Sequence, residues 1–262
     1  MAHRQLILAF VAGTLVATLA GLIGLGGAEF RLPLLIGVFG FVALEAVVLN
    51  KAISLIVVAA ALLFRSRSVP ISEIVSHSSV VLTLVGGSLF GAWFGADLAT
   101  RLSHRALYRV IAVLLLGIAL LLLTVHEQSA GVQPLLIGTA QTIVGVSAGF
   151  VIGVVASFLG VAGGELLIPS LVLLFGVEIK LAGSLSLAVS LPTMIVGFTR
   201  YSRDKSFAVL TRHRGFVLAM AAGSIVGALF GGFLLGVVPS KILVPLLAAI
   251  LVLSAVKVWR HR

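Results

Sequence analysis

Two glutamates stand in closely similar contexts in the two halves of the chain. Glu29 lies within GLGGAEFRLP, residues 24–33, and Glu165 lies within VAGGELLIPS, residues 161–170. Both stretches interrupt long apolar segments. A charged side chain at the centre of a membrane helix costs about 2.5–3.5 kcal/mol on insertion scales, so its default interpretation is functional. Each glutamate could carry a proton, cap the following helix by accepting its N–H groups, or lie at a membrane interface.

Glycines and a proline surround each glutamate. Glycine lacks the side chain that disfavours unusual backbone angles, so it favours a helix end. Proline suits the first turn of a helix, where its missing N–H is not needed. Each stretch therefore predicts a helix end, a tight turn and a new helix start, whose free N–H groups and dipole favour an anion. The backbone positions of this predicted anion site are Gly24, Gly26, Gly27 and Pro33 in the first stretch and Gly160, Gly163, Gly164 and Pro169 in the second.

Two cationic side chains belong to the first half only. Arg31 carries a planar fork of donors that fits an oxyanion. It could instead extend to the membrane interface or pair with Glu29. Lys51 could face the same site or mark the end of a helix. Both side chains are candidates for holding an anionic substrate.

Neutral polar residues follow the two stretches. Asn50 and Ser54 are four residues apart, as are Ser186 and Ser190, so each pair shares one helix face. Together with Ser184 they offer neutral donors, which suit an anion that must also be released. The alternative is hydrogen bonding between helices, which is common in membrane bundles.

The composition predicts an all-α, polytopic transmembrane helical bundle. The chain is 60% hydrophobic and 10% charged, with a mean hydropathy of +1.27. Globular chains are about 45–50% apolar and about 25% charged. Apolar runs long enough to cross a bilayer recur along the chain, for example residues 106–125 and 241–258. The alternating pattern of a membrane β-barrel is missing.

The net charge of +10 comes from basic residues in short segments between the apolar runs. This distribution is typical of cytoplasmic loops, so we do not expect nucleic acid as a partner. The chain has no cysteine, which excludes disulfides and thiolate metal sites. No metal cluster or cofactor motif stands out, and none is expected.

A shift of the sequence by 136 positions aligns its two halves without gaps. The register holds over about 120 residues, and the identities include polar residues, at Gln5/Gln141, Glu29/Glu165, Pro33/Pro169 and His77/His213. We therefore expect two repeats, residues 1–126 and 137–262, joined by a loop at 127–136. The N-terminus resembles a signal peptide, but the second copy of this helix lies deep in the chain, where it cannot be a cleaved signal.

Each repeat divides into five apolar pieces, of which the second, at residues 32–44 and 168–180, is short. Thirteen helical residues reach about 20 Å, against about 30 Å for a bilayer core. If all five pieces cross, the second repeat is inverted and 13 of the 18 Lys and Arg residues lie on one side. If the short piece does not cross, the repeats are parallel, and the Lys and Arg residues divide into 11 on one side of the membrane and 7 on the other. The larger asymmetry favours inverted repeats with both termini in the cytoplasm.

Two further patterns have structural interpretations. Glycines recur every four residues at Gly87, Gly91 and Gly95, and at Gly223, Gly227 and Gly231. They predict close helix packing; a ridge that faced outward would also suit a homodimer. Gly145-Val-Ser147-Ala-Gly149 matches the G-x-S-x-G motif of serine hydrolases, but that motif requires a preceding strand, and here it lies within an apolar helix. We therefore expect no enzyme.

The doubled glycine–proline element carries a resemblance to a known family. The pattern G-x-G-G-x(5)-P, followed by a short helix and an A-x-S-L segment, resembles the TauE/SafE family of sulfite and sulfonate exporters. The A-x-S-L segments are Ala52-Ile53-Ser54-Leu55 and Ala188-Val189-Ser190-Leu191. The second copy departs from the first at Ala162, where the first has Gly26, and at Leu187, where the first has Lys51.

The resemblance implies a multi-pass plasma-membrane transporter for sulfite or a short organosulfonate. It implies export by alternating access, driven by the membrane potential or by protons carried on Glu29 and Glu165. Import of the same anions and an anion channel are the alternatives in transport. A membrane-embedded enzyme is the rival from another class. The expected partners are the small anion, membrane lipid and, from the glycine ridges, a second copy of the chain.

Overall fold

The computed structural model describes residues 3–21, 27–65, 71–125, 134, 136–233 and 240–260. Within these ranges the ordered elements are helices, and no strand occurs. The prediction of an all-α bundle is therefore confirmed.

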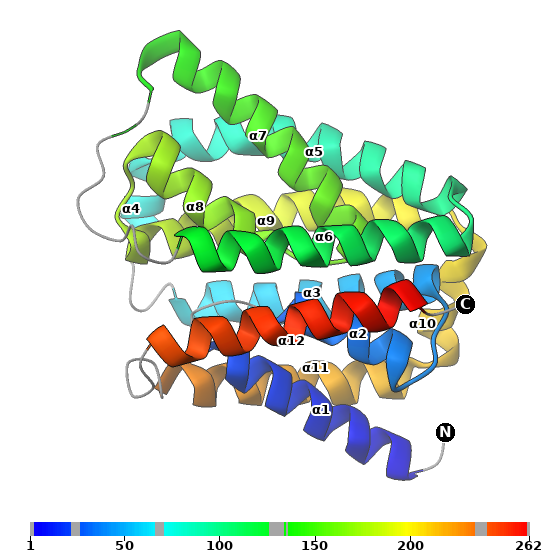
Figure 1. Cartoon of the computed structure of the whole chain (residues 1–262). Helices are drawn as coiled ribbons and strands as arrows, with labels where there is room; N and C mark the ends of the chain where they lie inside the picture. The colour runs from blue at the N-terminus through cyan, green and yellow to red at the C-terminus, as the bar shows by residue number, and fades with distance from the viewer. Residues whose placement is uncertain are drawn as a thin grey trace.

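The two halves of the chain form similar series of helices (Figure 1). The first half contains α1 His3–Gly21, α2 Ala28–Gly37, α3 Ala43–Arg65, α4 Ile71–Ser76, α5 Ser78–Arg101 and α6 His104–Val125. The second half contains α7 Gly138–Leu159, α8 Gly164–Phe175, α9 Ile179–Tyr201, η1 Lys205–Phe207, α10 Ala208–Arg212, α11 Arg214–Phe233 and α12 Ser240–Arg260.

Six of the described helices are long and apolar enough to cross a membrane: α3, α5, α6, α7, α9 and α11. The chain is thus an integral membrane protein. Helices α2 and α8 have only 10 and 12 residues, which reach about 15 and 18 Å. The short second helix of each half was predicted, but its position was wrong by several residues. It begins at Ala28 and Gly164 and ends at Gly37 and Phe175, instead of spanning 32–44 and 168–180.

The glycine ridges lie inside the bundle, where they join the two halves of the chain. Helix α1 packs against α11, and α5 packs against α7. The glycines touch backbone of the opposite helix at four sites: Gly87 at Val146, Gly91 at Phe150, Gly223 at Phe10 and Gly227 at Thr14. The alignment of the two halves superimposes the first two contacts on the last two. Close packing is confirmed at these glycines. Because they face a helix of the same chain, they no longer argue for a homodimer.

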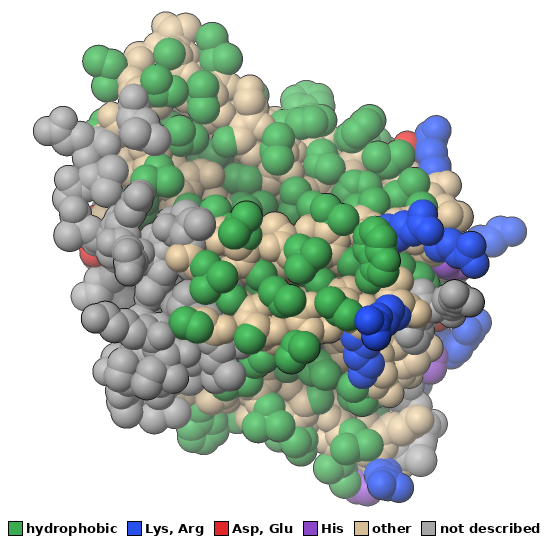
Figure 2. Space-filling view, viewed as in Figure 1, with side chains coloured by type: hydrophobic (Ala, Val, Ile, Leu, Met, Phe, Trp, Pro, Cys, Tyr) green, Lys and Arg blue, Asp and Glu red, His purple; other side chains and the backbone are tan. Residues whose placement is uncertain are grey.

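Both chain termini lie on the same side of the bundle (Figure 1). On the face drawn in Figure 2, Lys and Arg side chains gather at this edge, and hydrophobic side chains cover the middle of the molecule. An apolar belt with charged residues at its edge is the surface expected of a membrane-spanning protein.

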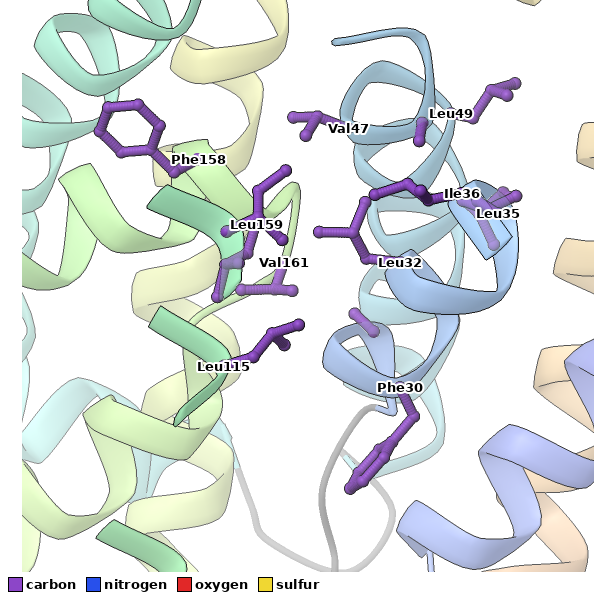
Figure 3. Close-up of a cluster of buried hydrophobic side chains, with 14 of the residues drawn as sticks. Phe30, Leu32, Leu35, Ile36, Val47, Leu49, Leu115, Phe158, Leu159 and Val161 are labelled. Atoms are coloured by element: carbon purple, nitrogen blue, oxygen red, sulfur yellow. The ribbon is translucent and has the colours of Figure 1, made fainter. Parts of the chain in front are cut away.

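A large hydrophobic cluster holds α2 in place. Phe30, Leu32, Leu35 and Ile36 of α2 are all buried, and they belong to the same cluster as buried residues of α3 and α6. Leu32 points toward Leu159 at the end of α7 (Figure 3). A second cluster forms around α8 and α9. Both short helices are therefore fixed deep in the protein, which positions the polar residues they carry.

Candidate transport site

The two short helices start alike. The N-cap residue is Gly27 in α2, with φ of 70°, and Gly163 in α8, with φ of 81°. Residues with side chains rarely adopt this left-handed conformation, so glycine permits the sharp turn into each helix. The predicted site residues Gly24 and Gly26 lie outside the described residues. Gly160 is the C-cap of α7, with φ of 65°, and Gly164 is the first residue of α8.

The sequence predicted the prolines in the first turn of each short helix, and this prediction was wrong. Pro33 and Pro169 lie inside α2 and α8, at the sixth residue of each helix. A helical N–H at that position would bond to the carbonyl oxygen four residues earlier. Since proline has no N–H, the carbonyl oxygens of Glu29 and Glu165 lack this helix bond. Each proline thus leaves the backbone carbonyl of one of the two glutamates without its helical hydrogen bond.

The carboxyl groups of Glu29 and Glu165 lie deep in the protein and near each other. Glu29 is fully buried and Glu165 is 5% exposed, and the two carboxyl groups interact electrostatically. Among the described residues, neither carboxylate oxygen of Glu29 has a hydrogen-bond partner, and neither does Oε2 of Glu165. Glu29 is therefore not an interfacial residue.

Arg31 is buried and held by three neutral side chains from two other helices. Its Nε donates to Oδ1 of Asn50 at 2.8 Å, Nη2 donates to Oγ of Ser54 at 2.6 Å, and Nη1 donates to Oγ of Ser224 at 3.1 Å. A guanidinium has five N–H donors, so these bonds leave two. Arg31 interacts electrostatically with Glu29, but within the described chain it has no ion-pair partner within 4.0 Å. It is only 1% exposed, so it does not extend to the interface.

Asn50 connects this cluster to the end of α7. Its Nδ2 donates to the carbonyl oxygen of Ala28 at 2.9 Å and to that of Leu159 at 2.8 Å. One amide side chain thus orients Arg31 and links α2, α3 and α7. The face shared by Asn50 and Ser54 was predicted, and both residues contact Arg31.

The second half has a different polar arrangement. In the alignment of the two halves Leu167 takes the place of Arg31, so the second half has no arginine at that position. Ser186 donates to the carbonyl oxygen of Gly183 at 2.9 Å, and Ser190 donates to that of Ala162 at 2.7 Å. Among the described residues, the hydroxyl oxygen of Ser184 has no partner. The site is therefore asymmetric, with its cationic group in the first half.

Lys51 does not mark a helix end. It is the ninth residue of α3 and is fully buried. Its Nζ lies 3.4 Å from the carbonyl oxygen of Ala156, and no carboxylate of the described chain is within 4.0 Å.

Four buried polar residues were missed by sequence reasoning. They are Ser88, Ser157, Thr193 and Ser224. The hydroxyl groups of Ser88 and Thr193 lie 2.6 Å apart, and Ser224 binds Arg31. Ser88 and Ser224 each follow the first glycine of a ridge and occupy equivalent positions in the two halves, which is the signal that could have identified them.

Other features of the molecule lie away from this site. A groove of about 800 Å³ is lined by residues of α5, α7 and α9, including Phe90, Trp93 and Phe150, but by none of the predicted site residues. Ser147 of the hydrolase-like motif is exposed on α7 and donates to the carbonyl oxygen of Ile143. Among the residues that the structure describes, no group of His, Cys, Asp and Glu could hold a metal.

Comparison with known proteins places the chain in a family. The family model described as Sulfite exporter TauE/SafE matches residues 6–260, which is nearly the whole chain. No curated protein and no solved structure matches it. The family consists of transporters, not enzymes. This match over nearly the whole chain, together with the six described helices long enough to span a membrane, shows that the chain belongs to the TauE/SafE sulfite exporter family and is a membrane transporter.

Proposed function

We propose that this chain exports a small oxyanion, sulfite or a short organosulfonate, across the plasma membrane, and that Arg31 binds the anion. The observation that carries this proposal is a buried guanidinium held by Asn50, Ser54 and Ser224, all of them neutral. Neutral acceptors orient the arginine without neutralising it, and Glu29 interacts with it electrostatically but forms no ion pair within 4.0 Å. A charge left in this state in a low-dielectric interior attracts an anion strongly.

The geometry of Arg31 suits an oxyanion in particular. Three bonds fix the plane of the guanidinium, and two N–H donors remain for a ligand. Paired donors in one plane match two oxygens of a sulfite or sulfonate group. The N–H groups at the start of α2 supply further donors, with the positive end of the helix dipole.

Glu29 and Glu165 would couple the anion to a proton. Two ionised carboxylates close to each other and to the anion would repel both each other and the anion. A proton bound by the pair removes part of this repulsion, so the anion and the proton bind together more favourably than either binds alone. If the anion instead moves without a proton, the membrane potential, negative inside, would drive it outward.

The architecture supports alternating access between two inverted repeats, residues 1–126 and 137–262. Each repeat contributes one short helix that begins at a left-handed glycine. Interrupted helices at matching positions of two repeats are typical of transporter substrate sites. Glu29, Arg31 and Lys51 are at most 1% exposed, so an anion can enter only when helices move. Both termini, on the side where basic residues gather (Figures 1 and 2), would be cytoplasmic.

Flux measurements in liposomes test this function. The purified chain is reconstituted, and uptake of labelled sulfite, a short sulfonate, sulfate and a neutral amino acid is measured with and without a pH gradient. We expect saturable movement of sulfite or the sulfonate, exchange of labelled for unlabelled anion, and no movement of the amino acid. Currents far above carrier turnover, without exchange, would identify a channel instead. No movement of any anion under any gradient would overturn the proposal.

A further inference from the structure

Lys51 is the second buried cation of the chain, and its surroundings differ from those of Arg31. An ammonium group has three N–H donors. In the described structure Nζ makes one long contact, 3.4 Å to the carbonyl oxygen of Ala156. Glu29 interacts electrostatically with Glu165 and Arg31, and its interactions do not include Lys51. A fully buried lysine with unused donors and no carboxylate of the described chain within 4.0 Å is costly inside a membrane, and it can bind a ligand without first breaking an ion pair.

The end of Lys51 packs closely against a glycine. A Cβ atom on Gly197 of α9 would lie 3.0 Å from Nζ of Lys51 and 3.2 Å from Oγ of Ser157 at the end of α7. The Lys51 amine and the Ser157 hydroxyl therefore both lie beside the backbone of Gly197. Ser157 is fully buried and donates its hydroxyl to the carbonyl oxygen of Ala92 at 2.9 Å. Tyr201 donates to the carbonyl oxygen of Ser157 at the same distance. The walls around Lys51 are thus fixed by hydrogen bonds between α5, α7 and α9.

Lys51 and Arg31 occupy neighbouring but separate places. Lys51 follows Asn50 directly on α3, so the two side chains leave the helix about 100° apart. Asn50 contacts Arg31 on one side and the carbonyl oxygen of Leu159 on the other. Lys51 contacts Ala156 of the same α7. The Arg31 cluster and Lys51 therefore both contact the last turn of α7, through Leu159 and Ala156.

Lys51 belongs to the first half of the chain only. Leu187 takes its place in the second half, so that half has no such lysine. The two fully buried cations of the described chain, Arg31 and Lys51, are therefore both contributed by the first half.

We infer that Lys51, beside Gly197 and Ser157, forms a second oxyanion site next to that of Arg31. This inference rests on the proposed anion transport. Movement of α9 away from α3 would open the space over Gly197 and let Nζ bind one oxygen of the sulfite or sulfonate group. The anion would then pass between two cations and never lie uncompensated in the apolar interior.

The test uses sulfonate transport in liposomes by Lys51 variants. We expect Lys51→Met to raise the half-saturating sulfonate concentration about tenfold or more, as expected from loss of a charge-assisted hydrogen bond, and Lys51→Arg to retain most transport. Lys257→Met removes an exposed lysine from the last turn of α12 and should leave transport unchanged. A Lys51→Met variant that matches the wild type would overturn the inference.

Chemical restoration of the charge separates binding from folding. Because the chain has no cysteine, Lys51→Cys carries the only thiol. Modification with an aminoethyl thiosulfonate reagent returns an ammonium to this position, whereas a sulfonatoethyl reagent adds an anion. We expect the first reagent to restore transport and the second to abolish it. Equal effects of the two reagents would overturn the inference. Failure of the wild-type chain to move any oxyanion would count against the proposed function itself.

Discussion

At the residue scale, four buried charged side chains of the described chain distinguish this protein from an inert bundle of membrane helices. Glu29, Arg31 and Lys51 are at most 1% exposed, and Glu165 is 5% exposed. In the described part of the chain none of them forms an ion pair within 4.0 Å. Structural ion pairs would neutralise one another permanently. Groups that are oriented by neutral neighbours, as Arg31 is, remain able to bind a ligand that comes and goes.

The glutamate pair leads to the first prediction. Glu29→Gln and Glu165→Gln each remove a proton-binding group but retain a side chain of the same shape. We expect transport to continue in each variant and its stimulation by a pH gradient to be lost, as measured by liposome uptake at matched anion concentrations. Glu73→Gln, on the exposed face of α4, is the control and should retain the stimulation. Full stimulation in the double variant would show that the pair carries no proton.

At the element scale, the site depends on how α2 and α8 begin. Gly163 has φ of 81°, and a Cβ atom there would lie 3.1 Å from Cγ2 of Ile152. Gly40 has a similar φ of 73° but no atom within 4 Å of its Cβ position. Replacing either glycine by alanine places a side chain on a left-handed backbone, which costs about 1–2 kcal/mol. Only at Gly163 would the added Cβ also meet neighbouring atoms.

We therefore predict that Gly163→Ala and Gly40→Ala both lower the thermal stability of the purified protein, and that Gly163→Ala lowers it more. Only Gly163→Ala should also slow transport, because it displaces the start of α8. Thermal unfolding and liposome flux on the same preparations measure the two effects. Equal transport by both variants would show that the left-handed turn has no part in the site.

The pairing of α5 with α7 gives the next prediction. A Cβ atom on Gly87 would collide with the carbonyl oxygen of Val146, whereas one on the preceding residue, Gly86, would meet no atom within 4 Å. We expect Gly87→Ala to lower the unfolding temperature. Gly86→Ala should leave it unchanged or raise it, since alanine is favoured over glycine in helices by up to about 1 kcal/mol. A Gly87→Ala variant as stable as Gly86→Ala would contradict the observed pairing.

Sequence reasoning succeeded where residue type alone determines the outcome. The apolar runs and the paired glycine stretches predicted the helices and the two short elements, and the polar residues singled out on the following helices, Asn50, Ser54, Ser186 and Ser190, are all buried. It failed where the outcome depends on partners distant in sequence. Whether Arg31 extends to the interface or lies inside depends on Ser224, which is 193 residues away in sequence. The starts of α2 and α8 were misplaced because proline was assumed to occupy the first turn.

At the scale of the whole molecule, the arrangement of the termini bears on the proposed inverted repeats. Both termini lie on one side, and α4 lies on the opposite side (Figure 1). Because the chain has no cysteine, labelling of a single introduced cysteine shows on which side of the membrane that position lies. We predict that a membrane-impermeant thiol reagent added outside intact cells labels Glu73→Cys and does not label Arg4→Cys or Arg260→Cys. Labelling of the terminal positions from outside would reverse the proposed orientation.

The most direct test of the central claim, that Arg31 binds the transported anion, is equilibrium binding of radiolabelled sulfite to the purified chain in lipid nanodiscs. We compare the wild type with Arg31→Gln and with Arg31→Lys, which retains the charge but not the fork of donors. We predict saturable binding to the wild type, intermediate binding to Arg31→Lys, and affinity lower by about 10- to 100-fold in Arg31→Gln, since a hydrogen bond to a charged group contributes about 1.5–3 kcal/mol. Wild-type affinity in a correctly folded Arg31→Gln protein would contradict the claim and place the anion elsewhere.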